Sequence, residues 1–132
     1  MYVDAKDTTV SYKISATGTW EPSLISLIGH IVKPGDKVLN LGSQSGLEAL
    51  VMGKIVGPTG KLFIFEPYSF SNEIVSRNVE LNGLEDIATV YKVGASNAKE
   101  TAIINVAYSN TGGSQIIPDS VNKGEFGLFD ET

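Results

Sequence analysis

The sequence predicts an α/β domain built on a parallel sheet, and two observations support this prediction. Apolar runs that suit buried strands alternate with segments of helical periodicity, in the order strand, helix, strand, helix, strand. The first apolar run, Val38 to Leu41, also ends in the small-residue loop Gly42 to Gly46, and a helix-like segment follows directly. Short connections of this kind predict right-handed crossovers, a local strand order of 3-2-1, and a ligand crevice at the carboxyl ends of the strands.

Composition narrows the possible classes of function. The chain has 132 residues, which suits one domain, and 42% of them are hydrophobic. A net charge of -5 without a basic stripe argues against a nucleic-acid partner. The absence of cysteine excludes disulfides and thiolate metal sites, and with a single histidine we predict no metal, a site built from carboxylates alone being the remaining alternative. The first residues are too polar for a signal peptide and no apolar run could cross a bilayer, so we expect a cytoplasmic protein without membrane contact.

The segment ahead of the glycine loop contains three expected elements. Alternating apolar residues predict a short strand over residues 8–15. A helix should begin at Pro22, which suits a first helical turn, and its apolar stripe would comprise Leu24, Leu27, Ile28 and Ile31. Residues 33–36 form a turn, and residues 37–41 then read as a parallel strand that is covered on both faces.

The rest of the chain continues the alternation and then loses it. We expect a helix over residues 47–56, a strand over 61–65, a helix over 69–81 and a strand over 87–93. The helix over 47–56 would be apolar along Leu47, Leu50, Val51 and Ile55. A loop at 94–97 and a further strand at 101–108 should follow. From Ile116 we expect little regular structure, so the predicted domain covers residues 1–117 and an irregular tail covers 118–132.

The glycine loop indicates a ligand site at the start of a helix. Gly42 gives the dihedral freedom for a tight turn, and Gly46 lets the helix start pack closely. A dinucleotide-binding loop of the form G-x-G-x-x-G would have glycine where this chain has Gln44. That side chain would crowd a pyrophosphate, which disfavours a nicotinamide-binding domain and favours a ligand without phosphates. An ordinary glycine turn remains the alternative.

Glu66 makes a nucleoside the favoured ligand. It stands 20 residues after Gly46, at the end of the second predicted strand. A carboxylate at this position can accept hydrogen bonds from ribose hydroxyls. The alternative is a solvated acid that happens to follow a strand.

These stretches resemble the amino-terminal, cofactor-binding half of class I S-adenosylmethionine-dependent methyltransferases, especially the FkbM type. The resemblance covers residues 18–117 and rests on the stretches Trp20–Pro22, Lys33–Gly46, Phe63–Pro67, Asn78–Asn82 and Val93–Ser96. It implies S-adenosylmethionine as cofactor and methyl transfer to an oxygen or nitrogen atom of a small-molecule or glycan-like acceptor. It names no catalytic base in this chain.

The resemblance also assigns parts of the cofactor to residues. The glycine loop would pass under the methionine part, Glu66 would hold the ribose, and Glu21 would help to bind the methionine amine. Pro67 and Tyr68 would border the adenine, and residues 94–96 would close over its edge. The candidate cofactor-binding residues are therefore Glu21, Asn40, Gly42, Ser43, Gln44, Ser45, Gly46, Glu66, Pro67, Tyr68, Gly94, Ala95 and Ser96.

The chain departs from the family pattern in two respects. Asn40 stands where an acid is usual, and Ser43-Gln44 replaces the usual Ala-Asn, so weak cofactor binding is expected. The resemblance further implies a Rossmann-like three-layer sandwich whose sheet is truncated, with residues 37–41 at an open edge. Exposed edges pair with something, so we expect a homo-oligomer or a missing carboxyl-terminal half. The competing hypothesis is a non-catalytic, degenerate half-domain that self-assembles or completes a partner's sheet.

Overall fold

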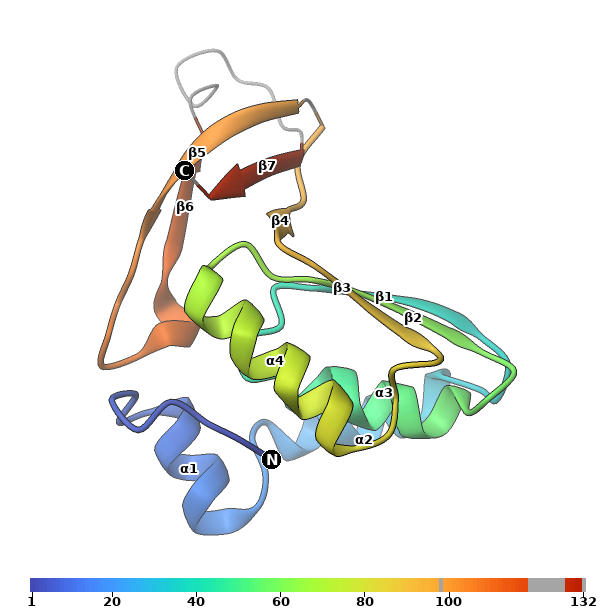
Figure 1. The fold of residues 1–132 in the computed structure, drawn as a ribbon. Helices are drawn as coiled ribbons and strands as arrows, with labels where there is room; N and C mark the ends of the chain where they lie inside the picture. The colour runs from blue at the N-terminus through green and yellow to red at the C-terminus, as the bar shows by residue number, and fades with distance from the viewer. Residues whose placement is uncertain (98, 119–127, 132) are drawn as a thin grey trace.

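A three-stranded parallel sheet lies at the centre of the protein (Figure 1). The computed structural model describes residues 1–97, 99–118 and 128–131. The sheet has the order β1-β2-β3, with β1 at Lys37–Leu41, β2 at Lys61–Phe65 and β3 at Ala88–Tyr91. This confirms the predicted parallel sheet and its local order of 3-2-1. Leu41 pairs with Phe65 and Phe65 with Tyr91, so the carboxyl ends of the three strands lie level at one edge.

The helices that connect these strands begin and end where the sequence predicts. Helix α3 covers Leu47–Val56, α4 covers Ser69–Leu81, and α2 covers Pro22–Ile31 ahead of β1. Each is bounded by residues that favour a helix start or end. Pro22 occupies the first turn of α2, Gly57 ends α3, and the turn at Asn82–Gly83 follows α4.

The described helices cover one face of the sheet (Figure 1). On the other face Leu39 and Leu41 are 60% and 57% exposed, and Phe65 stacks on Tyr91 at 5.0 Å between ring centroids. The described residues therefore form two layers of the expected three-layer sandwich. Strand β1 lies at the edge of its sheet, as predicted.

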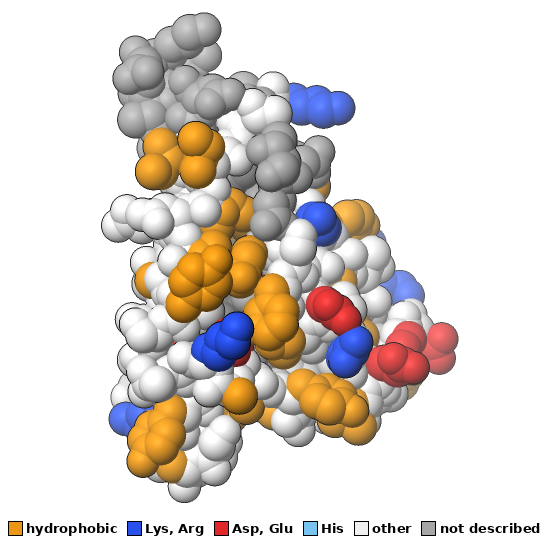
Figure 2. Space-filling view, turned by 60° about the vertical axis from the view of Figure 1, so that its left-hand side comes forward, with side chains coloured by type: hydrophobic (Ala, Val, Ile, Leu, Met, Phe, Trp, Pro, Cys, Tyr) orange, Lys and Arg blue, Asp and Glu red, His pale blue; other side chains and the backbone are white. Residues whose placement is uncertain are grey.

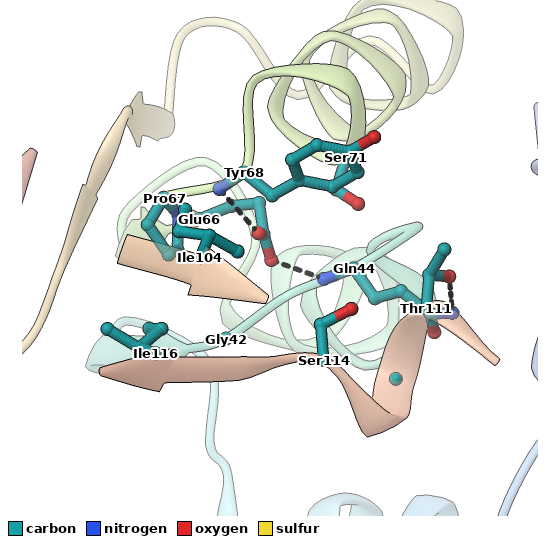
Figure 3. A pocket seen from close by; sticks show the side chains of 11 residues that line it. Gly42, Gln44, Glu66, Pro67, Tyr68, Ser71, Ile104, Thr111, Ser114 and Ile116 are labelled. Carbon is teal, nitrogen blue, oxygen red and sulfur yellow. Dashed lines mark hydrogen bonds between the residues drawn. The ribbon is translucent and has the colours of Figure 1, made fainter. Parts of the chain in front are cut away.

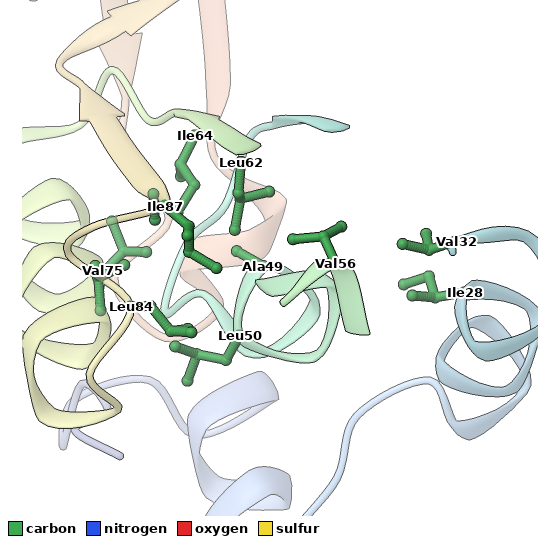
Figure 4. Packing of buried hydrophobic residues seen from close by; sticks show 12 residues of the cluster. Ile28, Val32, Ala49, Leu50, Val56, Leu62, Ile64, Val75, Leu84 and Ile87 are labelled. Carbon is green, nitrogen blue, oxygen red and sulfur yellow. The ribbon is translucent and has the colours of Figure 1, made fainter. Parts of the chain in front are cut away.

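The core lies between the sheet and α3 and α4 (Figure 4). Its most deeply buried hydrophobic side chains, all at 0% exposure, are Ala49, Val56, Leu62, Ile64 and Val75. Helix α3 packs through Ala49, Leu50, Gly53 and Val56, a face that only partly overlaps the predicted one. Of the stripe predicted on α2 only Ile28 is buried, because α2 contacts α3 and no helical layer within the described residues covers its outer side.

The predicted strand over residues 8–15 is wrong, because helix α1 occupies Val10–Thr17. The carboxylate of Asp7 accepts hydrogen bonds from the amides of Thr9 and Val10, at 2.9 and 3.1 Å. A carboxylate that satisfies the first free N–H groups stabilises a helix start. The alternating apolar residues that predicted a strand do not share one face of the helix, because Val10 and Ile14 are buried whereas Tyr12 is exposed.

A second sheet, which contains both antiparallel and parallel strand pairs, follows β3. Its order is β4-β7-β5-β6, where β4 is Val93–Gly94, β5 is Lys99–Asn105, β6 is Gln115–Pro118 and β7 is Leu128–Glu131. The strand predicted over 87–93 is thus divided between two sheets, and strands occupy parts of the expected irregular tail. Residues 119–127 and 132 of that tail lie outside the described residues.

The β5–β6 hairpin returns through a 3-10 turn, η1, at Thr111–Gly113. Ile103 and Ile104 pair with Ile117 and Ile116, and β-branched residues of this kind favour a pleated strand. Figure 1 shows that the hairpin brings η1 next to the carboxyl edge of the central sheet, near the start of α4.

Several hydrophobic side chains reach the surface, as the face in Figure 2 illustrates. Those that lie on the sheet edge, α2 and the hairpin include Leu27, Ile31, Leu39, Leu41, Ile103 and Ile117. Across the described part of the chain, no helix has the length and apolar character needed to cross a membrane.

Candidate cofactor site

The loop between β1 and α3 has the two glycine roles that the sequence predicts. Gly42 has φ +76°, and a Cβ atom there would meet nothing within 4 Å, so the position requires only dihedral freedom. Gly46 has φ +87°, and its Cβ would lie 2.5 Å from Cγ2 of Val75. The second glycine therefore permits the close approach of α3 and α4. Between them Gln44 also adopts a left-handed conformation, with φ 50°.

Asn78 is a buried residue of α4 that hydrogen-bonds to the glycine loop. Its side chain is 0% exposed, and its Nδ2 donates hydrogen bonds to the carbonyls of Ser45 and Tyr2, both at 2.8 Å. Its Oδ1 accepts the amide hydrogen of Tyr2 at 2.5 Å. Asn78, the first residue of the stretch Asn78–Asn82 on which the family resemblance rests, thus connects the amino terminus to the glycine loop.

Two hollows border this loop. The smaller has a volume of about 130 Å³ and the larger about 420 Å³. Gly42 and Gln44 border both hollows, together with Gly112 of η1. The strand end, the glycine loop and the turn of the hairpin therefore form one composite site.

The smaller hollow is organised by Glu66 (Figure 3). This carboxylate is 6% exposed, and it accepts hydrogen bonds from the amides of Gln44 at 2.7 Å and Tyr68 at 3.1 Å. Glu66 therefore links the glycine loop to the segment after β2. Apolar side chains contribute to the remaining wall, namely Pro67, Tyr68, Ile104 and Ile116.

The larger hollow contains polar atoms that lack partners. Oδ1 of Asn40 and Oγ of Ser43 are buried, and neither has a hydrogen-bond partner among the described residues. Buried polar atoms are satisfied in the great majority of cases, so these two oxygens can form hydrogen bonds with a bound ligand or with water. Trp20 and Glu21, which precede α2, and Glu48 in the first turn of α3 also line this hollow.

A buried network fixes the turn η1 against the loop. The Nε2 of Gln44 donates to Oδ2 of Asp7 at 2.7 Å and to Oγ1 of Thr111 at 2.6 Å, and the Thr111 hydroxyl donates to Asp7 at 3.0 Å. Burial raises the pKa of Asp7, but hydrogen bonds from Thr9, Ser11 and Thr111 outweigh burial and hold the pKa below its ordinary value. Gln44, a departure from the family pattern, is thus a structural link in this chain.

The pKa of Glu48 is shifted in the opposite direction to that of Asp7. Burial raises the pKa of this carboxyl, the charge of Glu21 raises it further, and a hydrogen bond from its own amide offsets part of the increase. Sequence reasoning missed Glu48, because an acid in the first turn of a helix is expected simply to complement the helix dipole. A half-buried acid that faces a second acid in a hollow has a less ordinary environment.

The structure brings most of the predicted site residues together. Those that border the two hollows are Glu21, Asn40, Gly42, Ser43, Gln44, Glu66, Pro67 and Tyr68. Ser45 and Gly46, at the end of the loop, are buried and do not border either hollow. Gly94, Ala95 and Ser96 border neither hollow, because the chain after β3 enters the second sheet, where Gly94 pairs with Phe129. Their contact with the cofactor stays a prediction.

The hairpin contributes wall residues that the sequence analysis did not identify: Ile104, Thr111, Gly112, Ser114 and Ile116. The β-branched residues Ile116 and Ile117 favour a strand at 115–118. No local sequence pattern, however, indicates that this strand lies over the glycine loop. Among the residues that the structure describes, no group of three or more His, Cys, Asp or Glu side chains could hold a metal ion.

Comparison with known proteins identifies the family. Residues 2–123 match the protein-L-isoaspartate(D-aspartate) O-methyltransferase (PCMT) family. The chain is 28% identical over 104 residues to a protein-L-isoaspartate O-methyltransferase of Methanothermobacter thermautotrophicus, which covers 77% of this chain and 48% of that protein. It is 31% identical over 98 residues to a protein-L-isoaspartate O-methyltransferase of Thermotoga maritima, covering 73% of this chain and 31% of that protein.

A solved structure agrees with these matches. The crystal structure of an S-adenosylmethionine-dependent O-methyltransferase of Thermotoga maritima is similar with a TM-score of 0.52 and 26% identity, over 61% of this chain and 32% of that one. The chain thus spans about half the length of the Methanothermobacter relative and about a third of the Thermotoga relative. The finer FkbM type is left open by these matches. The chain belongs to the PCMT family of class I methyltransferases, whose members use S-adenosylmethionine as methyl donor.

Proposed function

We propose that this chain forms the S-adenosylmethionine-binding part of a methyltransferase, with the adenosine end of the cofactor in the smaller hollow and the methionine end in the larger. The observation that carries this proposal is the position of Gly42, Gln44 and Gly112, which border both hollows. A ligand with a nucleoside at one end and an amino acid at the other has the shape that such a divided site requires.

The character of each hollow supports this orientation. Glu66 and the apolar side chains of Pro67, Tyr68, Ile104 and Ile116 suit a ribose and a flat heteroaromatic ring. In the larger hollow the oxygens of Asn40 and Ser43 have no hydrogen-bond partner among the described residues, and the amino acid end of the cofactor would supply polar groups there. Each hollow therefore offers what one end of the cofactor needs.

When bound, the cofactor supplies an activated methyl group. The residues of this chain would bind and orient it and would exclude water from the crevice. We further propose an oxygen atom as methyl acceptor, because the matching family is described by O-methyl transfer. The FkbM type and a small-molecule or glycan-like acceptor are finer predictions within this proposal.

Completion of the sheet is a second part of the proposal. We expect the open edge of β1 and the face carrying Leu39 and Leu41 to be covered in the active protein, either by a carboxyl-terminal half or by a second copy of the chain. Large apolar side chains exposed on an unpaired edge strand support that expectation.

Titration calorimetry with S-adenosylmethionine and S-adenosylhomocysteine tests the proposal. We expect both to bind, and we expect Glu66→Gln to lower the affinity about tenfold or more, which corresponds to about 1.4 kcal/mol. The exposed Glu85→Gln is a matched control that should leave binding unchanged. Thermal unfolding of each free variant checks that the loop remains folded. Absence of both heat and a thermal shift with either ligand would overturn the proposal.

A further inference from the structure

Two acidic side chains line the larger hollow, and the described part of its wall contains no cationic side chain. Glu21 and Glu48 both contribute to its wall, and none of its lining residues in the described chain is Lys, Arg or His. The ion pair that the described residues do form, Arg77 with Glu73, lies on the exposed surface of α4. The negative charge of this hollow is therefore not balanced by a side chain on its own wall.

The fold holds each of the two acids in a specific position. Glu48 lies in the first turn of α3, directly after the glycine loop. Glu21 precedes α2 in a left-handed conformation with φ 44°, and its carbonyl accepts the amide hydrogens of Leu24 at 2.8 Å and Ile25 at 3.1 Å. Burial is the main cause of the raised pKa of Glu48, and repulsion from the Glu21 carboxylate contributes to it.

The uncharged polar groups in the larger hollow also suit a cationic ligand. Ser43 is 3% exposed, and its Oγ has no partner among the described residues although it belongs to the wall. Oδ1 of Asn40 is a hydrogen-bond acceptor that is likewise buried and has no partner among the described residues. Two carboxylates, an amide oxygen and a hydroxyl together suit a group with several hydrogen-bond donors and a positive charge. A primary ammonium group has both properties.

We propose that Glu48, together with Glu21, receives the ammonium group at the amino acid end of the cofactor. Glu48 would then supply, from the helix start, the negative charge that Asn40 does not provide at the strand end. This inference rests on the proposed function and adds a specificity: the site should distinguish ligands that carry the amino acid end from ligands that lack it.

Two probes separate this inference from the proposed function. S-adenosylhomocysteine and 5′-methylthioadenosine share the adenosine and the thioether sulfur, and only the former carries the amino acid. The wild-type chain should bind S-adenosylhomocysteine more tightly. Glu48→Gln should weaken that binding about tenfold and leave the affinity for 5′-methylthioadenosine unchanged, so the preference for the amino acid end is lost. Glu85→Gln, on the exposed surface, should change neither affinity.

Stability measurements exclude a merely structural role. Loss of a repelled carboxylate should leave the melting temperature of the free protein at pH 7 equal or higher, whereas loss of a structural contact would lower it. Glu48→Asp keeps the charge on a shorter side chain and should restore part of the affinity for S-adenosylhomocysteine.

The possible results have distinct meanings. If Glu48→Gln leaves the ratio of the two affinities unchanged, or weakens both ligands equally, the inference is overturned and the proposed function stands. If the wild-type chain binds neither probe, the proposed function fails and the inference fails with it.

Discussion

Substitution of Gly46 by alanine should destabilise the protein far more than the same change at Gly42. At Gly46 the new Cβ would lie 2.5 Å from Cγ2 and 3.3 Å from Cβ of Val75, in addition to a φ of +87°. A left-handed alanine costs about 1–2 kcal/mol, and overpacking of a core adds about 1–3 kcal/mol. The free energy of unfolding should therefore fall by about 2–5 kcal/mol. At Gly42 the dihedral cost stands alone, because nothing lies within 4 Å of the new Cβ.

Urea unfolding followed by circular dichroism measures this difference. Gly18→Ala is a control remote from both hollows, with φ +76° and open space around the new Cβ, and it should match Gly42→Ala in stability. The double variant Gly46→Ala/Val75→Ala lacks the clashing Cγ2. Its loss of stability should therefore be smaller than the sum of the losses measured for the two single variants. Equal losses at Gly46 and Gly42 would refute the reasoning that Gly46 is needed for helix packing.

Three further predictions concern other parts of the fold. Asn78→Ala should lower the free energy of unfolding by about 3 kcal/mol, because three hydrogen bonds of about 1 kcal/mol each are lost; a loss below 1 kcal/mol would contradict the role of Asn78 as a clamp. Because the pKa of Asp7 is depressed in the folded state, its contribution to stability is present above the unfolded pKa and is lost as the pH falls through the folded pKa. Asp7→Asn should therefore reduce the acid-side slope in urea unfolding over a pH series, and an unchanged slope would argue against this linkage. Light scattering of the 132-residue chain should report an oligomer, since β1 is an open edge, and a well-behaved monomer would contradict pairing between copies.

The central sheet and its helices could be predicted because their signals are local. Gly57 and Pro58 end α3, and Pro67 separates β2 from α4, so the apolar runs between them have clear limits. The resemblance to a class I methyltransferase was confirmed at the level of the family, whereas its FkbM type stays a prediction.

The parts that could not be predicted depend on contacts across the sequence. The Gln44 side chain bonds to Asp7 and to Thr111, which lie 37 and 67 positions away. No local pattern reveals that η1 would lie against the glycine loop. Helix α1 was missed because its apolar residues alternate like those of a strand, and the deciding factor was the carboxylate of Asp7 at the helix start.

The burial of α2 was also overestimated, for a different physical reason. Leu24, Leu27 and Ile31 form the expected stripe but are 38%, 53% and 62% exposed. An apolar stripe predicts a face that needs a partner, and in the described residues that partner is present only for Ile28. The sequence pattern therefore indicated the need for a covering layer that these residues do not supply.

The most direct test of cofactor binding at this crevice is amide chemical-shift mapping by NMR during titration with S-adenosylhomocysteine. We predict the largest shifts at the amides of Gly42, Gln44, Tyr68 and Gly112, which border the hollows or bond to Glu66. The amides of Lys54 and Asn82, at the other ends of α3 and α4, should not move. Unchanged spectra at saturating ligand, or shifts gathered away from the glycine loop, would contradict the account.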